Sequence, residues 1–526
     1  MIYIPIEKVK AVIQSERYDV ELSDLLSQGS SLRVCETRLS SRLIEKLEFK
    51  EQEPRFPFPE ERQIQIDAYE AWLKNDRKGI FAMATGSGKT VTALNCVLKQ
   101  YHEIGCYKAI IVVPTQALAL QWEKEAESFN FQNIISSHTT KGWKDSLSRY
   151  TTRSYINRSV NVVFITTYAT FIRKTVQDFI AKTKGIDSFI YIADEAHNIG
   201  STSVLAKLPD VINYRIGLSA TPERVYDDVG SKRIYQFFNS FPHEYTYRFT
   251  MKQAIDSGIL CHYSYSPIFV ELTKDEMEAY EHITSQLRPF IDPDTGKYSD
   301  EANLLLMKRK RIIHKAENKK MAIANLIDSL NINNRLAYTF VFVPKGYEEH
   351  NYSNCDYYDI DEDDIHIIDE YAEMFKQRGY SYHKYISGID DTPSILKSFA
   401  DGDIKILLSM KCLDEGVDIP RAEYAIFCSS TGNPRQFVQR RGRVLRKCKD
   451  KESATIWDLV VVPPDLSESS SDIDRNMFMW EVKRIINFAA LADNQIEILY
   501  GELKNICEQL RINLFEMMEE EYKQYH

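Results

Sequence analysis

Between about residues 60 and 240, short apolar runs alternate with segments that have helical spacing of apolar residues. The first run, Gly79–Met83, is followed by 90–99, where apolar residues recur at the interval of an amphipathic helix. Four later runs of the same kind are predicted strands, namely Ile110–Val113, Val162–Ile165, Phe189–Ala193 and Tyr214–Leu218. This alternation of strand and helix predicts a parallel sheet covered by helices.

A second unit with the same rhythm follows 241–272, a segment that we interpret as a linker region. Its predicted strands are Ala337–Val343, Ile404–Leu408, Tyr424–Phe427 and Ala454–Val461. A helical insert interrupts its start and carries the basic run Lys308–Arg311, which is typical of a solvated face and is also a candidate for touching phosphates. The two units predict an α/β fold with two tandem parallel-sheet domains.

The segments outside these units carry weaker signals. Residues 1–55 contain no motif, and we interpret them as an N-terminal accessory region. The tail has apolar positions at helical spacing, which indicates packing helices, with the binding of a partner as the alternative. The predicted division is 1–55, a first domain at 56–240, a second domain at 241–466 with its helical insert at 273–331, and a C-terminal helical extension at 467–526.

Composition narrows the class of protein. The 526 residues are 44% hydrophobic and 27% charged, which is ordinary for a soluble globular protein. No apolar run reaches membrane-spanning length, and no secretory signal is visible, so we expect a cytoplasmic protein without membrane contact. The nine cysteines form no CxxC pair, which argues against a zinc module or a disulfide framework. A net charge of −10 excludes a uniformly basic surface but not a local basic groove.

The loop Thr85–Thr90, between the first predicted strand and helix, has the composition of a phosphate-binding loop. Gly86 and Gly88 let the backbone curl, so that amide groups point inward at the positive end of the following helix. Lys89 can then reach the β- and γ-phosphates of a nucleotide, and the Thr90 hydroxyl can ligate Mg²⁺. Met83 stands where the usual pattern has glycine, so the strict spacing is missed by one residue.

Two adjacent acids, Asp194 and Glu195, follow another predicted strand. An aspartate in this position can hold Mg²⁺, and the neighbouring glutamate can face the attacking water during phosphoanhydride hydrolysis. His197 comes next and is a candidate for coupling the state of the nucleotide to the second domain.

In the second domain, the spacing of Gln439, Arg443 and Arg446 places a glutamine and two arginines on one helical or near-helical face. Guanidinium groups suit phosphate oxygens. If this face meets the phosphate loop across a cleft, the arginines stabilise charge on the transferring phosphoryl group.

The order of these motifs resembles superfamily 2 helicases and translocases, which have two RecA-like domains. The resemblance covers roughly residues 60–465. It rests on motifs at Arg62–Gln65, Met83–Thr90, Val113–Trp122, Thr166–Tyr168, Asp194–His197, Ser219–Pro222, Cys412–Pro420 and Gln439–Arg446. Together they resemble the branch that holds XPB-like repair helicases, phage recombination helicases and restriction-enzyme motor subunits, whose members mostly act on DNA.

The resemblance implies further roles by position. Adenine would be read by Arg62 and Gln65, with Gln63-Ile64 standing where related motors often have a stacking aromatic residue. The nucleotide would be held by Thr85, Gly86, Ser87, Gly88, Lys89, Thr90, Gly416 and Asp418, and Gln439 would complete the site with the arginines. The phosphates of one nucleic-acid strand would be held by Thr115, Thr166, Thr167 and Lys345, and Ser219 and Thr221 would bridge the two sites.

These patterns predict an ATP- and Mg²⁺-dependent helicase or translocase that acts on DNA. By resemblance, its setting is bacterial or phage repair, restriction or antiviral defence. Two alternatives stay open: an RNA helicase, and an ATP-gated clamp that never unwinds nucleic acid. The sequence shows no nuclease constellation, so we expect a separate subunit to make any cut.

Overall fold

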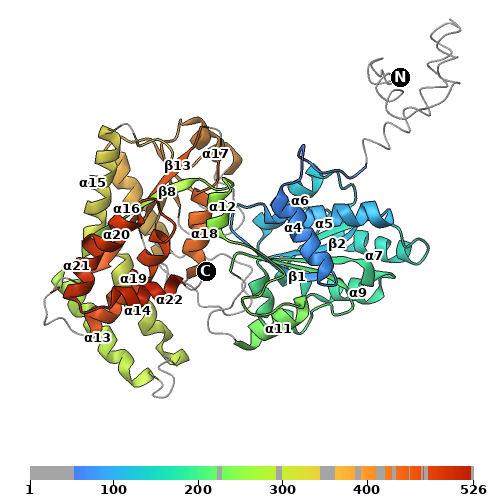
Figure 1. The fold of residues 1–526 in the computed structure, drawn as a ribbon, viewed down its shortest axis with the longest axis horizontal. Coiled ribbons are helices and arrows are strands. Elements are labelled where there is room, and N and C mark those ends of the chain that lie inside the picture. Colours follow the sequence, from blue (N-terminus) through green and yellow to red (C-terminus); the bar gives the residue numbers. More distant parts are fainter. Residues whose placement is uncertain are drawn as a thin grey trace, which may run out of the picture.

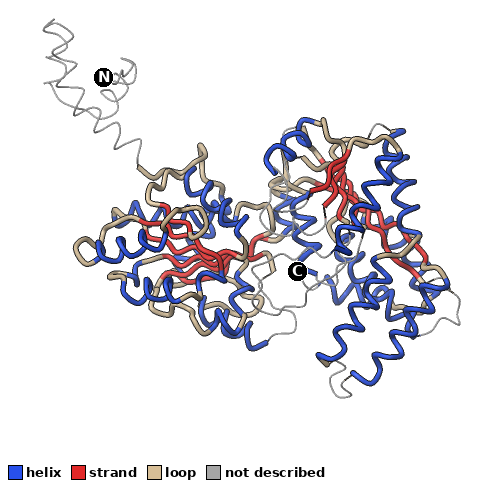
Figure 2. The backbone as a smooth tube through the Cα atoms, turned by 180° about the vertical axis from the view of Figure 1, so that it is seen from behind, coloured by secondary structure: helices blue, strands red, loops and turns tan. Residues whose placement is uncertain are grey.

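The computed structural model describes residues 53–221, 228–291, 299–333, 335–343, 362–385, 392–409, 421–428, 434–448, 450–463, 466 and 472–522. Nearly all of the expected accessory region 1–55 lies outside these residues. Figure 1 shows two α/β bodies, one blue to green and one green to red, each built on a sheet that helices cover. Figure 2 shows the two groups of strands from behind.

The first sheet has seven strands within the described residues, in the order β3-β4-β2-β5-β6-β1-β7, and every neighbouring pair is parallel. The strands are β1 (Lys78–Met83), β2 (Lys108–Val113), β3 (Ile134–Ser136), β4 (Val162–Thr167), β5 (Ile190–Asp194), β6 (Tyr214–Ser219) and β7 (Tyr247–Phe249). The helices of this body are α4 (Gln63–Lys74), α5 (Lys89–Ile104), α6 (Gln116–Ser128), α7 (Trp143–Ser154), α8 (Tyr168–Phe171), α9 (Lys174–Lys182), η1 (Ile186–Ser188), η2 (Ala196–Gly200), α10 (Thr202–Leu205) and α11 (Asp228–Phe238). Strands β2, β4 and β5 are buried along their whole length because helices cover both faces.

The second sheet is also all parallel, with the described strands in the order β10-β11-β9-β12-β13-β8. Its strands are β8 (His262–Glu271), β9 (Thr339–Phe342), β10 (Tyr382–Tyr385), β11 (Ile406–Ser409), β12 (Tyr424–Phe427) and β13 (Ser453–Val462). The helices before and around it are α12 (Met251–Asp256), α13 (Lys274–Leu287), η3 (Arg288–Phe290), η4 (Asp300–Ala302), α14 (Asn303–His314), α15 (Asn318–Ile332), α16 (Glu362–Gln377), α17 (Thr392–Asp401) and α18 (Pro434–Val444). The chain ends in α19 (Asp472–Ala489), α20 (Gln495–Tyr500), α21 (Glu502–Gln509) and α22 (Leu514–Tyr522).

The predicted fold class is confirmed, because both units are parallel sheets with covering helices. The interpretation of 241–272 as a linker was wrong: β7 joins the first sheet beside β1, and β8 joins the second beside β13. The signal was weak because β7 has only three residues and β8 contains Pro267, which an edge strand tolerates. We therefore propose a domain boundary between β7 and β8.

A buried cluster of charges joins α15 and α19 to the second sheet. Arg484 Nε lies 3.2 Å from Asp458 Oδ2, and Arg484 Nη2 lies 2.5 Å from Glu481 Oε2. The Tyr265 hydroxyl donates to the same Asp458 oxygen at 2.8 Å. Lys319 is fully buried beside this cluster, and burial lowers its pKa to about 8.

Replacing Lys319 with methionine should change how stability depends on pH. Lys319 binds its proton less tightly in the native protein than in the unfolded chain, so the unfolded chain holds more protons between about pH 8 and about pH 10. Parent stability relative to Lys319→Met should therefore rise by roughly 2 kcal/mol across this range. Urea unfolding of both proteins measures it, with the exposed Lys320, which pairs with Glu370, changed to methionine as the control. A difference that stays constant with pH would contradict the prediction.

Candidate functional site

The loop between β1 and α5 has the backbone geometry of an anion site. Gly86 and Gly88 have φ of +85° and +99°, a conformation that other residues rarely adopt. Gly88 is the N-cap of α5 and supplies no side-chain cap, so the first helical amides are available to a ligand. A Cβ atom built on Gly88 would have no atom within 4 Å, apart from those of Gly88 itself and its two neighbours in the sequence. The loop therefore fits a phosphate group.

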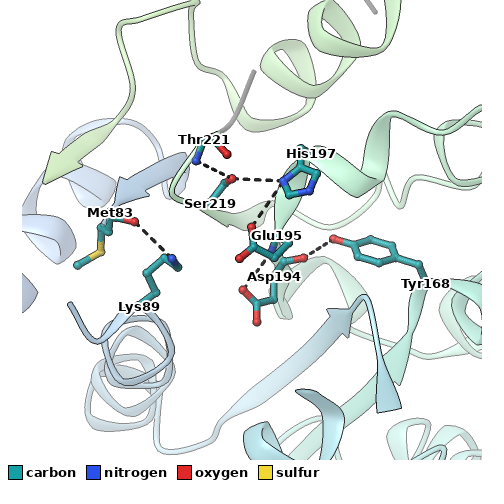
Figure 3. Close-up of polar contacts among 8 residues, drawn as sticks. All are labelled: Met83, Lys89, Tyr168, Asp194, Glu195, His197, Ser219 and Thr221. Carbon is teal, nitrogen blue, oxygen red and sulfur yellow. Dashed lines mark hydrogen bonds and ion pairs between the residues drawn. The ribbon is translucent and has the colours of Figure 1, made fainter. Parts of the chain in front are cut away.

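The predicted acids lie at the same edge of the sheet as this loop. In the parallel register, Ala82 of β1 pairs with Ser219 of β6, and Asp194 of β5 pairs with the preceding Leu218. Lys89, in the first turn of α5, points toward this edge and donates to the Met83 carbonyl oxygen at 3.3 Å (Figure 3). Ligands of parallel sheets bind at this carboxyl edge.

Hydrogen bonds hold Asp194 on three sides. Trp122 Nε1 donates to its Oδ2 at 2.8 Å, and the amide of Glu195 donates to its Oδ1 at 3.0 Å. The Tyr168 hydroxyl donates to the main-chain carbonyl of Asp194 at 2.8 Å (Figure 3). Burial raises the pKa of Asp194, opposed by the Trp122 hydrogen bond and the positive charge of Lys89.

Burial also changes the proton affinity of Lys89. It lowers the pKa of the ammonium group, while the carboxylates of Glu195 and Asp194 favour the charged form. The guanidinium groups of Arg446 and Arg443 act in the opposite direction. The charges of two acids and two arginines therefore act on the Lys89 ammonium group.

The candidate coupling residues meet beside Glu195. His197 Nδ1 lies 3.5 Å from Glu195 Oε2 and 3.4 Å from Ser219 Oγ, and the Thr221 amide donates to Ser219 Oγ at 3.1 Å (Figure 3). Glu195 has φ of +45°, which is rare for a residue with a side chain and typical of strained functional positions. Glu195 therefore combines an uncommon backbone conformation with a side-chain contact to His197 at the end of β5.

The second domain contacts the phosphate loop directly. A Cβ built at Gly442 of α18 would lie 2.7 Å from Thr85 Cβ, and one built at Gly86 would lie 3.1 Å from Arg446 Cγ. Arg443 is 7% exposed, and its charge acts on both Lys89 and Asp194. The structure therefore brings the predicted lysine and acids of one domain to the predicted arginines of the other.

The predicted face that carries Gln439, Arg443 and Arg446 is only partly helical. Helix α18 ends at Val444, and Arg446 lies beyond it, where its backbone forms a bridge with Leu260. The Lys451 ammonium group donates to the carbonyls of Val444 and Arg446 and so satisfies the end of the helix. Gln439 lies one turn before Arg443 and is buried.

The predicted adenine and loop residues have local roles in this structure. Gln65 is buried, and its Oε1 accepts a hydrogen bond from the Arg62 amide at 2.9 Å, which caps α4. Ser87 is buried and donates to the Ala84 carbonyl at 2.7 Å. Thr85 Oγ1 is buried without a hydrogen-bond partner in the structure, while Thr90 is half-buried in the first turn of α5. Adenine recognition stays a prediction.

The predicted strand-binding residues differ in their accessibility. Thr115 is half-buried and caps α6, and Thr167 is buried and caps α8. Thr166 is 0% exposed within β4, so its side chain is not available to a strand in this structure, and its predicted role in holding phosphates stays a prediction. Lys345, Gly416 and Asp418 lie outside the described residues.

Arg441 was not among the predicted residues, because the sequence shows it only as one basic residue of a run. It is 1% exposed, and its Nη1 donates to the Asn487 carbonyl at 2.7 Å and to the Tyr263 hydroxyl at 3.4 Å. Its guanidinium carbon lies 5.1 Å from the centre of the Phe488 ring. The C-terminal helix α19 therefore supports the helix that carries Arg443.

Two tandem parallel sheets, with a phosphate loop on one and Arg443 and Arg446 of the other beside it, are the arrangement of superfamily 2 helicases and translocases, which the chain resembles. Residues 58–224 match the family model "Type III restriction enzyme, res subunit", and residues 359–448 match "Helicase conserved C-terminal domain". Within the described part of the chain, no helix is long and apolar enough to cross a membrane.

Two known proteins resemble the chain along most of its length. "DNA 3'-5' translocase XPB2" of Sulfurisphaera tokodaii is 28% identical over 466 residues, which are 85% of this chain and 94% of that protein. "Putative helicase 22" of Sulfolobus islandicus filamentous virus is 22% identical over 416 residues, 76% of this chain and 64% of that protein.

A solved structure supports the same fold. The "ATP-dependent Type ISP restriction-modification enzyme LlaBIII bound to DNA" has a TM-score of 0.52 and 17% identity. The match covers 86% of this chain, which spans only 33% of that enzyme.

Proposed function

We propose that this protein is an ATP-dependent DNA translocase or helicase whose nucleotide binds between its two domains. The observation that carries the proposal is the contact of Gly442 and Arg446 with the phosphate loop, next to Lys89. A site shared in this way makes nucleotide binding favour one arrangement of the domains, and product release would relax it.

The donors at the sheet edge fit Mg²⁺ and ATP. Mg²⁺ sites commonly use one carboxylate together with phosphate oxygens and water, and Asp194 with the Thr90 hydroxyl supplies such a set beside open space at Gly88. When bound, MgATP would supply a phosphoanhydride whose hydrolysis releases free energy.

The residues at this site would then have distinct roles. Lys89 and the amides of the loop would hold the phosphates, and Glu195, fixed by its strained backbone, would orient the attacking water. Arg443 and Arg446 would stabilise the charge that develops on the transferring group. His197 and Ser219 would transmit a change in the position of Glu195 to the loop at Thr221 through their hydrogen bonds.

The preference for DNA is supported by the archaeal relative, which is named as a DNA translocase. Thr115 and Thr167, at the ends of β2 and β4, would hold the phosphates of one strand, and contacts of this kind carry no sequence preference. The family match of the first domain to a restriction-enzyme subunit supports a restriction or defence setting, with a separate subunit making any cut.

Steady-state ATP hydrolysis without polymer and with single-stranded DNA, duplex DNA, forked DNA or RNA tests the proposal. We expect DNA to stimulate hydrolysis more than RNA does, and the affinity for DNA to fall linearly on a log–log plot against salt, because the contacts are to phosphates. Stimulation by RNA alone would favour an RNA helicase. ATP-dependent DNA binding with neither strand displacement nor movement would favour a clamp.

A further inference from the structure

A tryptophan to which the sequence assigned no role, at the end of the motif Val113–Trp122, reaches the proposed metal-binding acid from a proposed strand-binding segment. Trp122 lies in α6, the helix that Thr115 caps by accepting a hydrogen bond from the Leu118 amide at 3.3 Å. The indole is 0% exposed, and its Nε1 donates to Asp194 Oδ2 at 2.8 Å. One helix therefore joins a proposed strand contact at its start to a carboxylate two turns later.

A second segment makes the same kind of connection. Tyr168 follows Thr167 directly and is 7% exposed. Its hydroxyl donates to the main-chain carbonyl of Asp194 at 2.8 Å, as Figure 3 shows. Because the Glu195 amide holds Asp194 Oδ1, a displacement of either donor must turn or shift the Asp194 carboxylate relative to the phosphate loop.

We propose that Trp122 and Tyr168 are positioning residues that couple strand binding at Thr115 and Thr167 to the metal-binding geometry of Asp194. The inference rests on the proposed function and adds the physical connection between its two sites. Strand phosphates that tighten on Thr115 would fix α6, and α6 would fix Asp194 Oδ2 through the indole. The Tyr168 hydroxyl would do the same for the main chain at the end of β5.

Coupling of this kind is measurable without hydrolysis. If DNA raises the affinity for a nucleotide, the nucleotide raises the affinity for DNA by the same factor, and typical factors are about 5 to 150. The test measures the affinity of a non-hydrolysable ATP analogue with and without single-stranded DNA, each in the presence of Mg²⁺ and in its absence. Because Asp194 acts through the metal, the DNA effect should depend on Mg²⁺.

Trp122→Phe and Tyr168→Phe remove one donor each and keep an aromatic ring. We expect each to reduce the DNA effect on analogue affinity several-fold, and the double variant to abolish it, while affinity without Mg²⁺ stays within about 2-fold of the parent. Two buried donors of the same domain provide matched controls. Trp72 Nε1 donates to the Arg215 carbonyl at 3.0 Å, and the Tyr150 hydroxyl donates to the Val160 carbonyl at 2.9 Å.

Trp72→Phe and Tyr150→Phe should keep the full DNA effect. Retention of the parental effect by both test variants would overturn the inference, and so would an equal loss in the controls, because the loss would then reflect general destabilisation. A parent that binds the analogue and DNA but shows no coupling would overturn it too. A parent that binds neither would instead refute the proposed function.

Discussion

The Arg443→Ala variant should hydrolyse ATP about 10³- to 10⁵-fold more slowly than the parent, the range for loss of an arginine that stabilises the transferring phosphoryl group. Arg443 is buried and directly follows Gly442, which contacts the phosphate loop, and its charge acts on Lys89 and Asp194. A guanidinium group in such a dry site stabilises developing charge far more than one in water.

Single-turnover hydrolysis at saturating DNA measures the effect of Arg443→Ala on the chemical step. Lys447→Ala is the matched control, since Lys447 is exposed one turn further along the chain and also carries a positive charge. The control should keep the parental rate. A rate for Arg443→Ala within about tenfold of the parent would show that the arginine does not act on the phosphoryl group.

Replacing Glu195 with glutamine should slow hydrolysis by about 10²- to 10⁴-fold, which is the usual contribution of a group that accepts a proton from the attacking water. The amide keeps the size of the carboxylate but cannot accept that proton. Nucleotide should still bind, because Lys89 and the loop amides are unchanged. The variant should therefore accumulate with ATP bound and the domains held together.

Rapid filtration with labelled ATP and DNA would separate binding from hydrolysis in Glu195→Gln. Asp187→Asn, which changes an exposed acid of the same domain, controls for the loss of a negative charge and should behave as the parent does. Hydrolysis by Glu195→Gln at the parental rate would mean that another group positions the water.

The sequence alone predicts much of the fold, because buried parallel strands are continuous apolar runs. Every predicted run became a strand, for example Val162–Ile165 within β4 and Tyr424–Phe427 as β12. The strands that were missed are short or at the edge: β7 has three residues, and β8 alternates polar residues and contains Pro267. Edge strands have one partner and one partly exposed face, so their composition is less distinctive.

Fewer features of the site than of the fold could be predicted from the sequence, because many of its contacts join segments that are distant along the chain. The Gly–Lys–Thr loop and the Asp–Glu pair are local patterns and were predicted. The bond from Trp122 to Asp194 spans 72 residues, and although Trp122 ends one of the recognised motifs, the sequence does not indicate this contact. The contact of Gly442 with Thr85 crosses the two domains and likewise leaves no local signal.

Hydrogen exchange of Glu195→Gln, with and without MgATP, tests most directly whether one nucleotide is held by both domains. We predict that MgATP slows exchange in two segments together, the loop 84–90 and the region around α18, 437–446, although they belong to different domains. Lys89→Ala should show neither effect. Protection confined to 84–90, with exchange at 437–446 unchanged, would contradict the account.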